Sequence, residues 1–324
     1  MNDRSLCLLD NYDIEVLRTR KGRGAILCET DRGLLTWREY SGYKDKVLFQ
    51  DHLLSLIREK GFLHAETILK NKDGELLSQD NDGTCYILKT YFEGRECNIR
   101  DMEECQEAVR VLAAFHNTAF AETSLSESGK PYSEIAEFEK HNRELKRVKK
   151  YLKDRGQKTD FELCLMKTYD YFLNLALQIT EEAKEFGSET MEGWICHGDF
   201  QYHNMIFSQG EMYLINFEKS VQGSRMRDLY LFMRKLLEKN NWSEEIGFDL
   251  IRTYKNDHPI EKEEYRRLYY RLAYPEKFWK IVNFYYNSGK AWIPGKNLEK
   301  LLKITGQEEE KQRFLKKYRE NFGL

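Results

Sequence analysis

The stretch HGDFQYHNMIFSQGEMYLINFE, residues 197–218, decides how this sequence folds. It places Asp199 and Asn204 five residues apart and continues with alternating apolar residues around a Ser-Gln-Gly turn. This order is typical of a phosphate-transfer loop, in which an aspartate accepts the proton of a hydroxyl and an asparagine binds Mg2+. A short hairpin then leads to an Asp-Phe pair whose carboxylate also binds the metal. Here Asn216 precedes Phe217, so an amide replaces the expected carboxylate.

The replacement at Asn216 weakens the predicted metal site. A pair of unit charges about 4 Å apart contributes on the order of 4 kcal/mol at an effective dielectric constant near 20, and Mg2+ carries two charges. An amide oxygen can still coordinate a hard cation, but it brings no net charge. Glu218 lies two residues further along an extended segment, which returns its carboxylate to the same side. We therefore expect weak Mg2+ binding and slow phosphoryl transfer.

Length and composition predict a folded chain with two lobes. The 324 residues exceed the roughly 250 that a single core usually serves, and 20 Tyr and 18 Phe support a well-filled interior. A net charge of -2 provides no field that would attract nucleic acid or a membrane surface, so we expect neither partner. The sequence shows no secretory signal, which predicts a cytoplasmic location. The seven cysteines are odd in number and lack zinc-ribbon spacing, so we expect reduced thiols.

The pattern of apolar residues predicts an α+β fold. Residues 13–92 contain short β-type segments around one helix, which follows Lys44 and stops at Gly61. From Gly94 onward helical periodicity dominates. We predict a small antiparallel β lobe with one main helix over residues 1–92. A large, mostly helical lobe over residues 93–324 contains the catalytic loop 197–204 and the metal loop 214–218.

Several segments resemble a known family. HGDFQYHN and YLINFE resemble the HGDxxxxN and IDFE loops of the aminoglycoside phosphotransferase and choline kinase superfamily. YILKTYFEGRE, LAAFH, RDLYLFMRKLL and AYPEKFW are similar to its CotS-type spore-coat branch, so the resemblance covers nearly the whole chain. It implies a two-lobed protein-kinase-like fold, ATP and Mg2+ as cofactors, and assembly into the spore coat. The implied partner is a small-molecule hydroxyl substrate or a spore-coat protein.

The resemblance also implies roles for residues of the loop. Asp199 would be the catalytic base, and His197 would brace the loop. Asn204 would bind magnesium, and Asn216 would be the altered second metal ligand. Asp228 would anchor the catalytic loop through backbone hydrogen bonds, although an ordinary helix N-cap explains this residue equally well.

In the β lobe, the resemblance implies a nucleotide site. Arg38 stands where the family has its phosphate-binding lysine, and a planar guanidinium is no neutral substitute for an ammonium. The segment KTYFEG resembles the hinge that binds adenine through its backbone, which assigns that role to the Thr90 carbonyl and the Phe92 amide. Asp51 is our candidate for the acidic partner of Arg38.

Some single motifs allow a second interpretation. His197 and His203 lack a third ligand at zinc spacing. Gly22 and Gly24 fit a phosphate cradle or a tight hairpin turn equally well. The basic run over 143–155 carries apolar residues at helical spacing and favours a solvated helix face.

Two functions remain open. One is an ATP-dependent O-phosphotransferase that Asn216 and Arg38 make weak. The alternative is a catalytically inactive, pseudokinase-like structural or binding protein of the spore coat.

Overall fold

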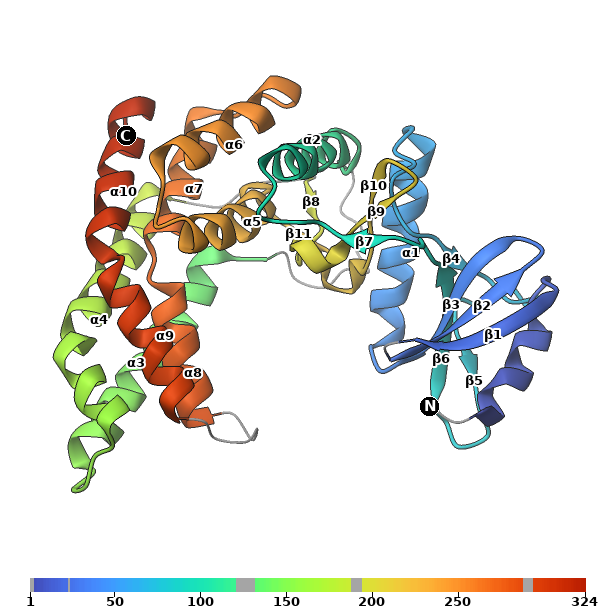
Figure 1. The fold of residues 1–324 in the computed structure, drawn as a ribbon, viewed down its shortest axis with the longest axis horizontal. Coiled ribbons are helices and arrows are strands. Elements are labelled where there is room, and N and C mark those ends of the chain that lie inside the picture. Colours follow the sequence, from blue (N-terminus) through green and yellow to red (C-terminus); the bar gives the residue numbers. More distant parts are fainter. Residues whose placement is uncertain (1–2, 23, 121–131, 188–193, 288–293) are drawn as a thin grey trace. The chain divides into compact units, whose positions relative to one another are not determined.

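The chain divides into two compact units (Figure 1). The computed structural model describes residues 3–22, 24–120, 132–187, 194–287 and 294–324. The first unit comprises residues 1–131 and 192–228, and the second comprises residues 132–191 and 229–324. The predicted lobe boundary at residue 92 falls inside the first unit and stays a prediction.

The first unit is built on an antiparallel sheet with the strand order β1-β2-β3-β6-β4, in which β5 also pairs with β6. The strands of this sheet are β1 (Val16–Gly22), β2 (Ala25–Thr30), β3 (Gly33–Tyr40), β4 (Ile68–Leu69), β5 (Ser78–Gln79) and β6 (Cys85–Thr90). Gly22 pairs with Ala25, so the glycines of this segment belong to the hairpin that joins β1 to β2. The predicted small antiparallel β lobe is therefore confirmed.

One face of the sheet holds an aromatic core. Trp37 of β3 stacks on Tyr86 of β6, with ring centroids 5.2 Å apart, and its indole nitrogen donates to Ser5 at 3.3 Å. Ser5 belongs to the 3-10 helix η1 (Asp3–Asn11), which covers this face. Successive side chains of a strand point to opposite faces, so Arg38 and Lys89 lie on the face opposite this core.

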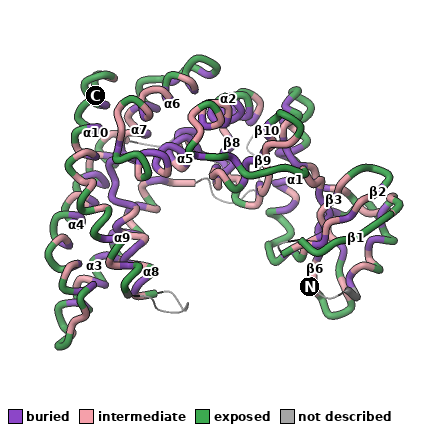
Figure 2. Tube along the Cα trace, in the orientation of Figure 1, coloured by how far each residue is buried: buried purple, intermediate pink, exposed green. Residues whose placement is uncertain are grey.

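Two long helices belong to the described part of the first unit, α1 (Lys44–Glu59) and α2 (Met102–Thr118). Each buries one mostly apolar face, and Figure 2 shows both buried and exposed residues along each helix. The Asp101 carboxylate caps α2 by accepting hydrogen bonds from the amides of Glu103 and Glu104. The helix predicted after Lys44 is α1, and its C-cap residue Lys60 directly precedes Gly61.

The stretch from His197 to Glu218 forms the predicted hairpin. Its strands are β9 (Met205–Ser208) and β10 (Glu211–Leu214), and β9 also pairs with β7 (Arg95–Glu96). The elements around the hairpin are β8 (Ile195–Cys196), η3 (Tyr202–Asn204), η4 (Phe217–Lys219) and β11 (Val221–Gln222). β8 pairs with β11, which brings the two ends of this stretch together.

The second unit is helical in its described part. Its helices are α3 (Glu134–Asp154), α4 (Asp160–Phe186), α6 (Glu244–Asp257), α7 (Lys262–Ala273), α8 (Glu276–Asn287), α9 (Pro294–Gly306) and α10 (Glu308–Phe322), together with α5 (Met226–Lys239) from Leu229 onward. The basic run over 143–155 lies largely on α3, whose Leu145, Val148 and Leu152 are buried while its charged residues are mostly solvated. The predicted mostly helical lobe is confirmed.

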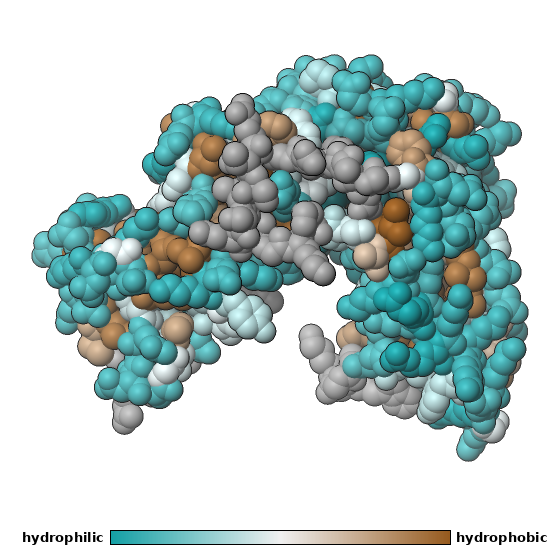
Figure 3. All heavy atoms as spheres, turned by 180° about the vertical axis from the view of Figure 1, so that it is seen from behind, coloured by the Kyte–Doolittle hydropathy of each residue, from teal (hydrophilic) through white to brown (hydrophobic). Residues whose placement is uncertain are grey.

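One face of the protein is largely polar. On the face drawn in Figure 3, apolar side chains lie in separate patches among hydrophilic ones. Among the described residues, no helix has the length and apolar character needed to cross a membrane.

The close approach of two chain segments at Gly94 can be tested. A Cβ atom on Gly94 would lie 1.9 Å from the carbonyl oxygen of Phe207 in β9, so Gly94→Ala forces the backbone apart. We expect the free energy of unfolding to fall by about 1–3 kcal/mol, measured by urea denaturation. Gly156→Ala is the control, because a Cβ there meets no atom within 4 Å. Equal stability of the two variants would contradict the described approach of the two segments.

Candidate active site

A buried carboxylate holds the start of the loop 197–204. Asp228, in the first turn of α5, accepts hydrogen bonds from the backbone amides of His197 at 2.6 Å and Gly198 at 2.9 Å. His116 of α2 lies 3.3 Å from the same carboxylate. Burial raises the pKa of Asp228, but the hydrogen bond with His116 and the electrostatic interactions with His116, His197 and Arg227 together outweigh it, so the pKa lies below its ordinary value. The side chain thus takes the anchoring position that the resemblance implies.

Gly198 permits this loop to close against η4. Its φ is +79°, and a Cβ atom would lie 1.9 Å from the carbonyl oxygen of Lys219. An L side chain would be strained by the backbone angle and would also meet the neighbouring backbone. The glycine before Asp199 is therefore a steric requirement of the loop.

His197 is a bracing residue. Its ring is buried, and Nε2 lies 3.0 Å from the carbonyl oxygen of Ile215 while Nδ1 lies 3.3 Å from the amide of Asp199. A carbonyl only accepts and an amide only donates, so the ring carries its proton on Nε2. The imidazole thereby joins the two halves of the loop, and both of its nitrogen atoms are engaged.

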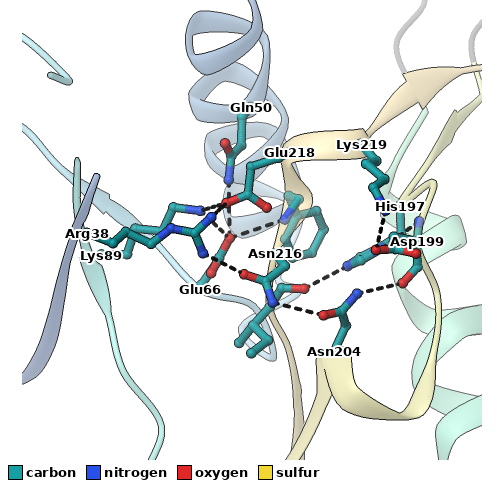
Figure 4. Close-up of polar contacts among 12 residues, drawn as sticks. Arg38, Gln50, Glu66, Lys89, His197, Asp199, Asn204, Asn216, Glu218 and Lys219 are labelled. Carbon is teal, nitrogen blue, oxygen red and sulfur yellow. Dashed lines mark hydrogen bonds and ion pairs between the residues drawn. The ribbon is translucent and has the colours of Figure 1, made fainter. Parts of the chain in front are cut away.

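Asp199 is ionised and paired. Its carboxylate accepts a hydrogen bond from Lys219 at 2.8 Å, which Figure 4 shows, and a second one from Gln201 at 2.7 Å. Burial raises the pKa of Asp199, but these two contacts outweigh it and leave the pKa below its ordinary value. The carboxylate can accept a proton only in competition with the ammonium of Lys219.

The side chains of the two asparagines that were expected to bind metal are hydrogen-bonded to each other. Asn216 Nδ2 donates to Asn204 Oδ1 at 2.8 Å, and Asn204 Nδ2 donates to the carbonyl oxygen of Asp199 at 2.8 Å. Arg38 Nη1 donates to Asn216 Oδ1 at 3.0 Å, which completes a chain from β3 to the catalytic loop. Figure 4 shows this chain from Arg38 through Asn216 to Asn204.

The backbone between Asn216 and Glu218 has a different conformation from the predicted one. Asn216 adopts a left-handed conformation, with φ 66° and ψ 60°, and Phe217–Lys219 forms the 3-10 helix η4. The expectation that Glu218 follows Asn216 along an extended segment is therefore wrong. Its Oε1 instead lies 3.0 Å from Arg38 and 2.7 Å from Lys89.

Lys89 is a site residue that sequence reasoning missed. Its side chain is only 1% exposed, and its ammonium lies 3.0 Å from Glu66 as well as 2.7 Å from Glu218. Glu66 Oε1 also accepts hydrogen bonds from Gln50 of α1 at 3.1 Å and from the Phe217 amide at 3.3 Å. The alternation of strand side chains, which puts Lys89 on the same face as Arg38, was a usable signal.

The predicted partner of Arg38 was wrong. Asp51 of α1 pairs with Lys70 at 3.2 Å, whereas the acidic partner of Arg38 is Glu218. On α1 it is Gln50 whose side chain is directed at Glu66. The next residue, Asp51, therefore points in another direction along the helix surface and belongs to a different ion pair.

These side chains border an open cavity of about 490 Å³. The described residues that line it are Arg38, Glu39, Tyr40, Ser41, Gly42, Lys46, Asp199, His203, Asn204, Asn216, Glu218 and Lys219. Thr90 and Phe92 are not among them. Thr90 pairs with Leu35 in the sheet, and the Phe92 ring stacks on Tyr213 with centroids 4.1 Å apart.

The oxygen donors of this site do not fit a magnesium ion as they are arranged. Amide and carboxylate oxygens are the right type of ligand. However, the side-chain oxygens of Asn204 and Asn216 accept N–H groups of the protein, and Glu218 Oε1 faces two cations. A metal ion would have to displace the N–H groups and side-chain cations from these oxygens. It would not gain a carboxylate ligand at position 216, where the side chain is an amide.

The anchoring role of Asp228 can be measured. Asp228→Asn turns an N–H donor toward the loop amides, so the free energy of unfolding should fall by about 3–5 kcal/mol at pH 7 in urea denaturation. Because the folded-state pKa is lowered, this stability is present above about pH 4 and is lost as the pH falls through the folded-state value. The difference between the two proteins should therefore shrink in acid. The exposed Asp73→Asn is the control, and an equally small loss in both variants would contradict the anchor.

The buried position of Lys89 gives a second prediction. Lys89→Met leaves Glu66 and Glu218 without their shared ammonium, so we expect a loss of about 3–5 kcal/mol in urea denaturation. Lys70→Met is the matched control, because its ammonium also pairs with a carboxylate but is 55% exposed, and it should cost under about 1 kcal/mol. Losses of the same size would show that Lys89 is not the central cation.

The sequence and the fold are similar to those of known proteins. "Spore coat protein S" of Bacillus subtilis (strain 168) is 25% identical over 319 residues, which cover 95% of this chain and 90% of that protein. The crystal structure of an aminoglycoside phosphotransferase from Alicyclobacillus acidocaldarius superposes with a TM-score of 0.83 at 20% identity, covering 98% of this chain and 96% of the other. A spectinomycin phosphotransferase solved with ADP and spectinomycin gives 0.69 at 13% identity, covering 97% and 98%.

These likenesses confirm the resemblance inferred from the loop motifs and the predicted kinase-like fold. The family described as "Spore coat putative kinase YutH" matches residues 6–318. Because that match spans nearly the whole sequence, the chain belongs to this spore coat kinase-like family.

Proposed function

We propose that this chain is a spore-coat-associated protein that binds ATP and transfers its terminal phosphoryl group slowly to a hydroxyl. One observation carries the proposal. Asp199, Asn204 and Asn216 line a single cavity together with the cations Arg38 and Lys219. The family membership and the phosphotransferases of the same fold support it.

The transfer step follows from the groups around the cavity. The acceptor oxygen attacks the terminal phosphorus of ATP while its proton passes to the Asp199 carboxylate, and the bond to the bridging oxygen breaks to release ADP. Lys219 and Arg38 offset the charge that spreads over the phosphoryl oxygens. Transfer is slow because Lys219 competes for the carboxylate of Asp199.

The proposal extends to ligands and location. The acceptor is the hydroxyl of a small molecule or of a spore-coat protein. The Thr90 carbonyl and the Phe92 amide bind the adenine ring. The protein is made in the cytoplasm and joins the spore coat, as the name of its Bacillus relative suggests.

A second function is favoured by the contacts between Arg38 and the two asparagines. Because these contacts use the oxygens that a metal would need, the chain can serve as a pseudokinase-like binding protein of the coat that holds nucleotide without turnover. Binding and turnover therefore have to be measured separately.

The base is tested by substitution. Asp199→Asn keeps the size of the side chain but removes the proton acceptor, so ADP production from ATP should fall by roughly 10²–10⁴-fold. The control is Asp170→Asn, an exposed carboxylate of α4. Turnover that survives Asp199→Asn would refute the assigned base.

Thermal unfolding of the unchanged protein and of the same two variants distinguishes nucleotide binding from turnover. A ligand that binds only the folded state raises the temperature of unfolding in proportion to RT ln(1 + [L]/Kd). A clear shift with ATP in the absence of any turnover would favour the binding protein. No shift at millimolar ATP would contradict both functions.

A further inference from the structure

We infer that Arg38 and Asn216 act together as a built-in replacement for a divalent cation, so that the cavity binds nucleotide phosphates without metal. The inference rests on the proposed function, because it assumes that a nucleotide occupies the cavity. It concerns a property of this chain that its fold does not determine.

The orientation of that amide is fixed by its neighbour. A guanidinium only donates hydrogen bonds, so the oxygen of Asn216 has to face Arg38, 3.0 Å away. The NH2 group is then turned toward Asn204 Oδ1, 2.8 Å away. An N–H group therefore points at the oxygen that should bind metal. Flipping the amide would bring two donors together at Arg38, so the two residues depart from the family pattern as one unit.

The charges of the site are balanced without a metal. Glu218 shares its Oε1 between Arg38 and the buried ammonium of Lys89. Three cations face three carboxylates, the cations being Arg38, Lys89 and Lys219 and the carboxylates Glu66, Glu218 and Asp199. Lys46 and Glu39 on the cavity lining add one charge of each sign. An aspartate at position 216 would add a fourth carboxylate to the three that these three cations already face, so a further cation would be needed to balance its charge.

The cavity keeps donors for an anionic ligand. The two bonds from Arg38 use only some of the N–H groups of its guanidinium, whose side chain is 33% exposed. The Lys219 side chain is 65% exposed, and Lys46 lies exposed on the same lining. Phosphate oxygens can therefore be bound by side-chain cations, which are tied to the protein and need no metal from solution.

The test measures ADP affinity with and without metal. Isothermal titration of the full chain with ADP is run once with Mg2+ and once with EDTA. We expect the two dissociation constants of the unchanged protein to agree within roughly threefold. Binding that weakens more than about tenfold in EDTA would overturn the inference and leave the proposed function standing. No binding in either solution would overturn the proposed function and this inference with it.

Asn216→Asp gives the converse result. The side chain keeps its size, and aspartate tolerates the left-handed backbone that Asn216 adopts. We expect ADP to bind at least about tenfold more weakly in EDTA, and Mg2+ to restore the affinity. Asn81→Asp, on an exposed turn, adds the same charge elsewhere and should bind as the unchanged protein does. If Asn216→Asp binds ADP equally in both solutions, the amide does not set the metal dependence and the inference is wrong.

Discussion

The ammonium of Lys89, enclosed between Glu66 and Glu218, is the contact on which the site depends. It joins β6 of the sheet to the segment before β4 and to η4, and Glu66 extends the connection to α1 through Gln50. Removing a charge from water is costly, so a buried lysine persists only where carboxylates surround it at hydrogen-bonding distance. This requirement fixes the position of Glu218, and Glu218 in turn orients Arg38.

The buried ion pairs determine geometry more than they add stability. Replacing a buried pair by apolar residues often leaves a protein equally stable, because desolvation offsets the attraction between the charges. Here the ion pairs fix the orientation of the side chains around the cavity. The planar guanidinium of Arg38 reaches Glu218 and Asn216 at once, and only one orientation of the Asn216 amide is compatible with that. A lysine ammonium at position 38 also only donates, but it would lack the planar fork that addresses Glu218 and Asn216 at once.

Much of the fold and part of the site could be predicted from the sequence. The spacing of Asp199 and Asn204 and the Ser-Gln-Gly turn are local patterns, and the structure contains the loop and the hairpin that they predict. Lys89 was missed because it lies in YILKTYF, where a charged residue among apolar ones reads as an exposed strand position. Its burial depends on Glu66 and Glu218, which are distant in sequence. Asparagine adopts the left-handed backbone of Asn216 more readily than most residues, but the hydrogen bond of its side chain to Arg38 joins residues that are distant in sequence.

Arg38 and Asn216, the two residues that depart from the pattern implied by the resemblance, are physically coupled. Considered singly, Arg38 keeps the positive charge of a lysine in a planar group, and Asn216 lacks the negative charge of a carboxylate ligand. In the structure they share a hydrogen bond, and Glu218 balances the charge that Arg38 retains. An aspartate at position 216 would give Arg38 a second carboxylate and would leave Asn204 facing an oxygen in place of a donor. Because of this pair, oxygens of a type that could bind a metal ion instead accept hydrogen bonds from the protein. The cations and carboxylates of this network are equal in number.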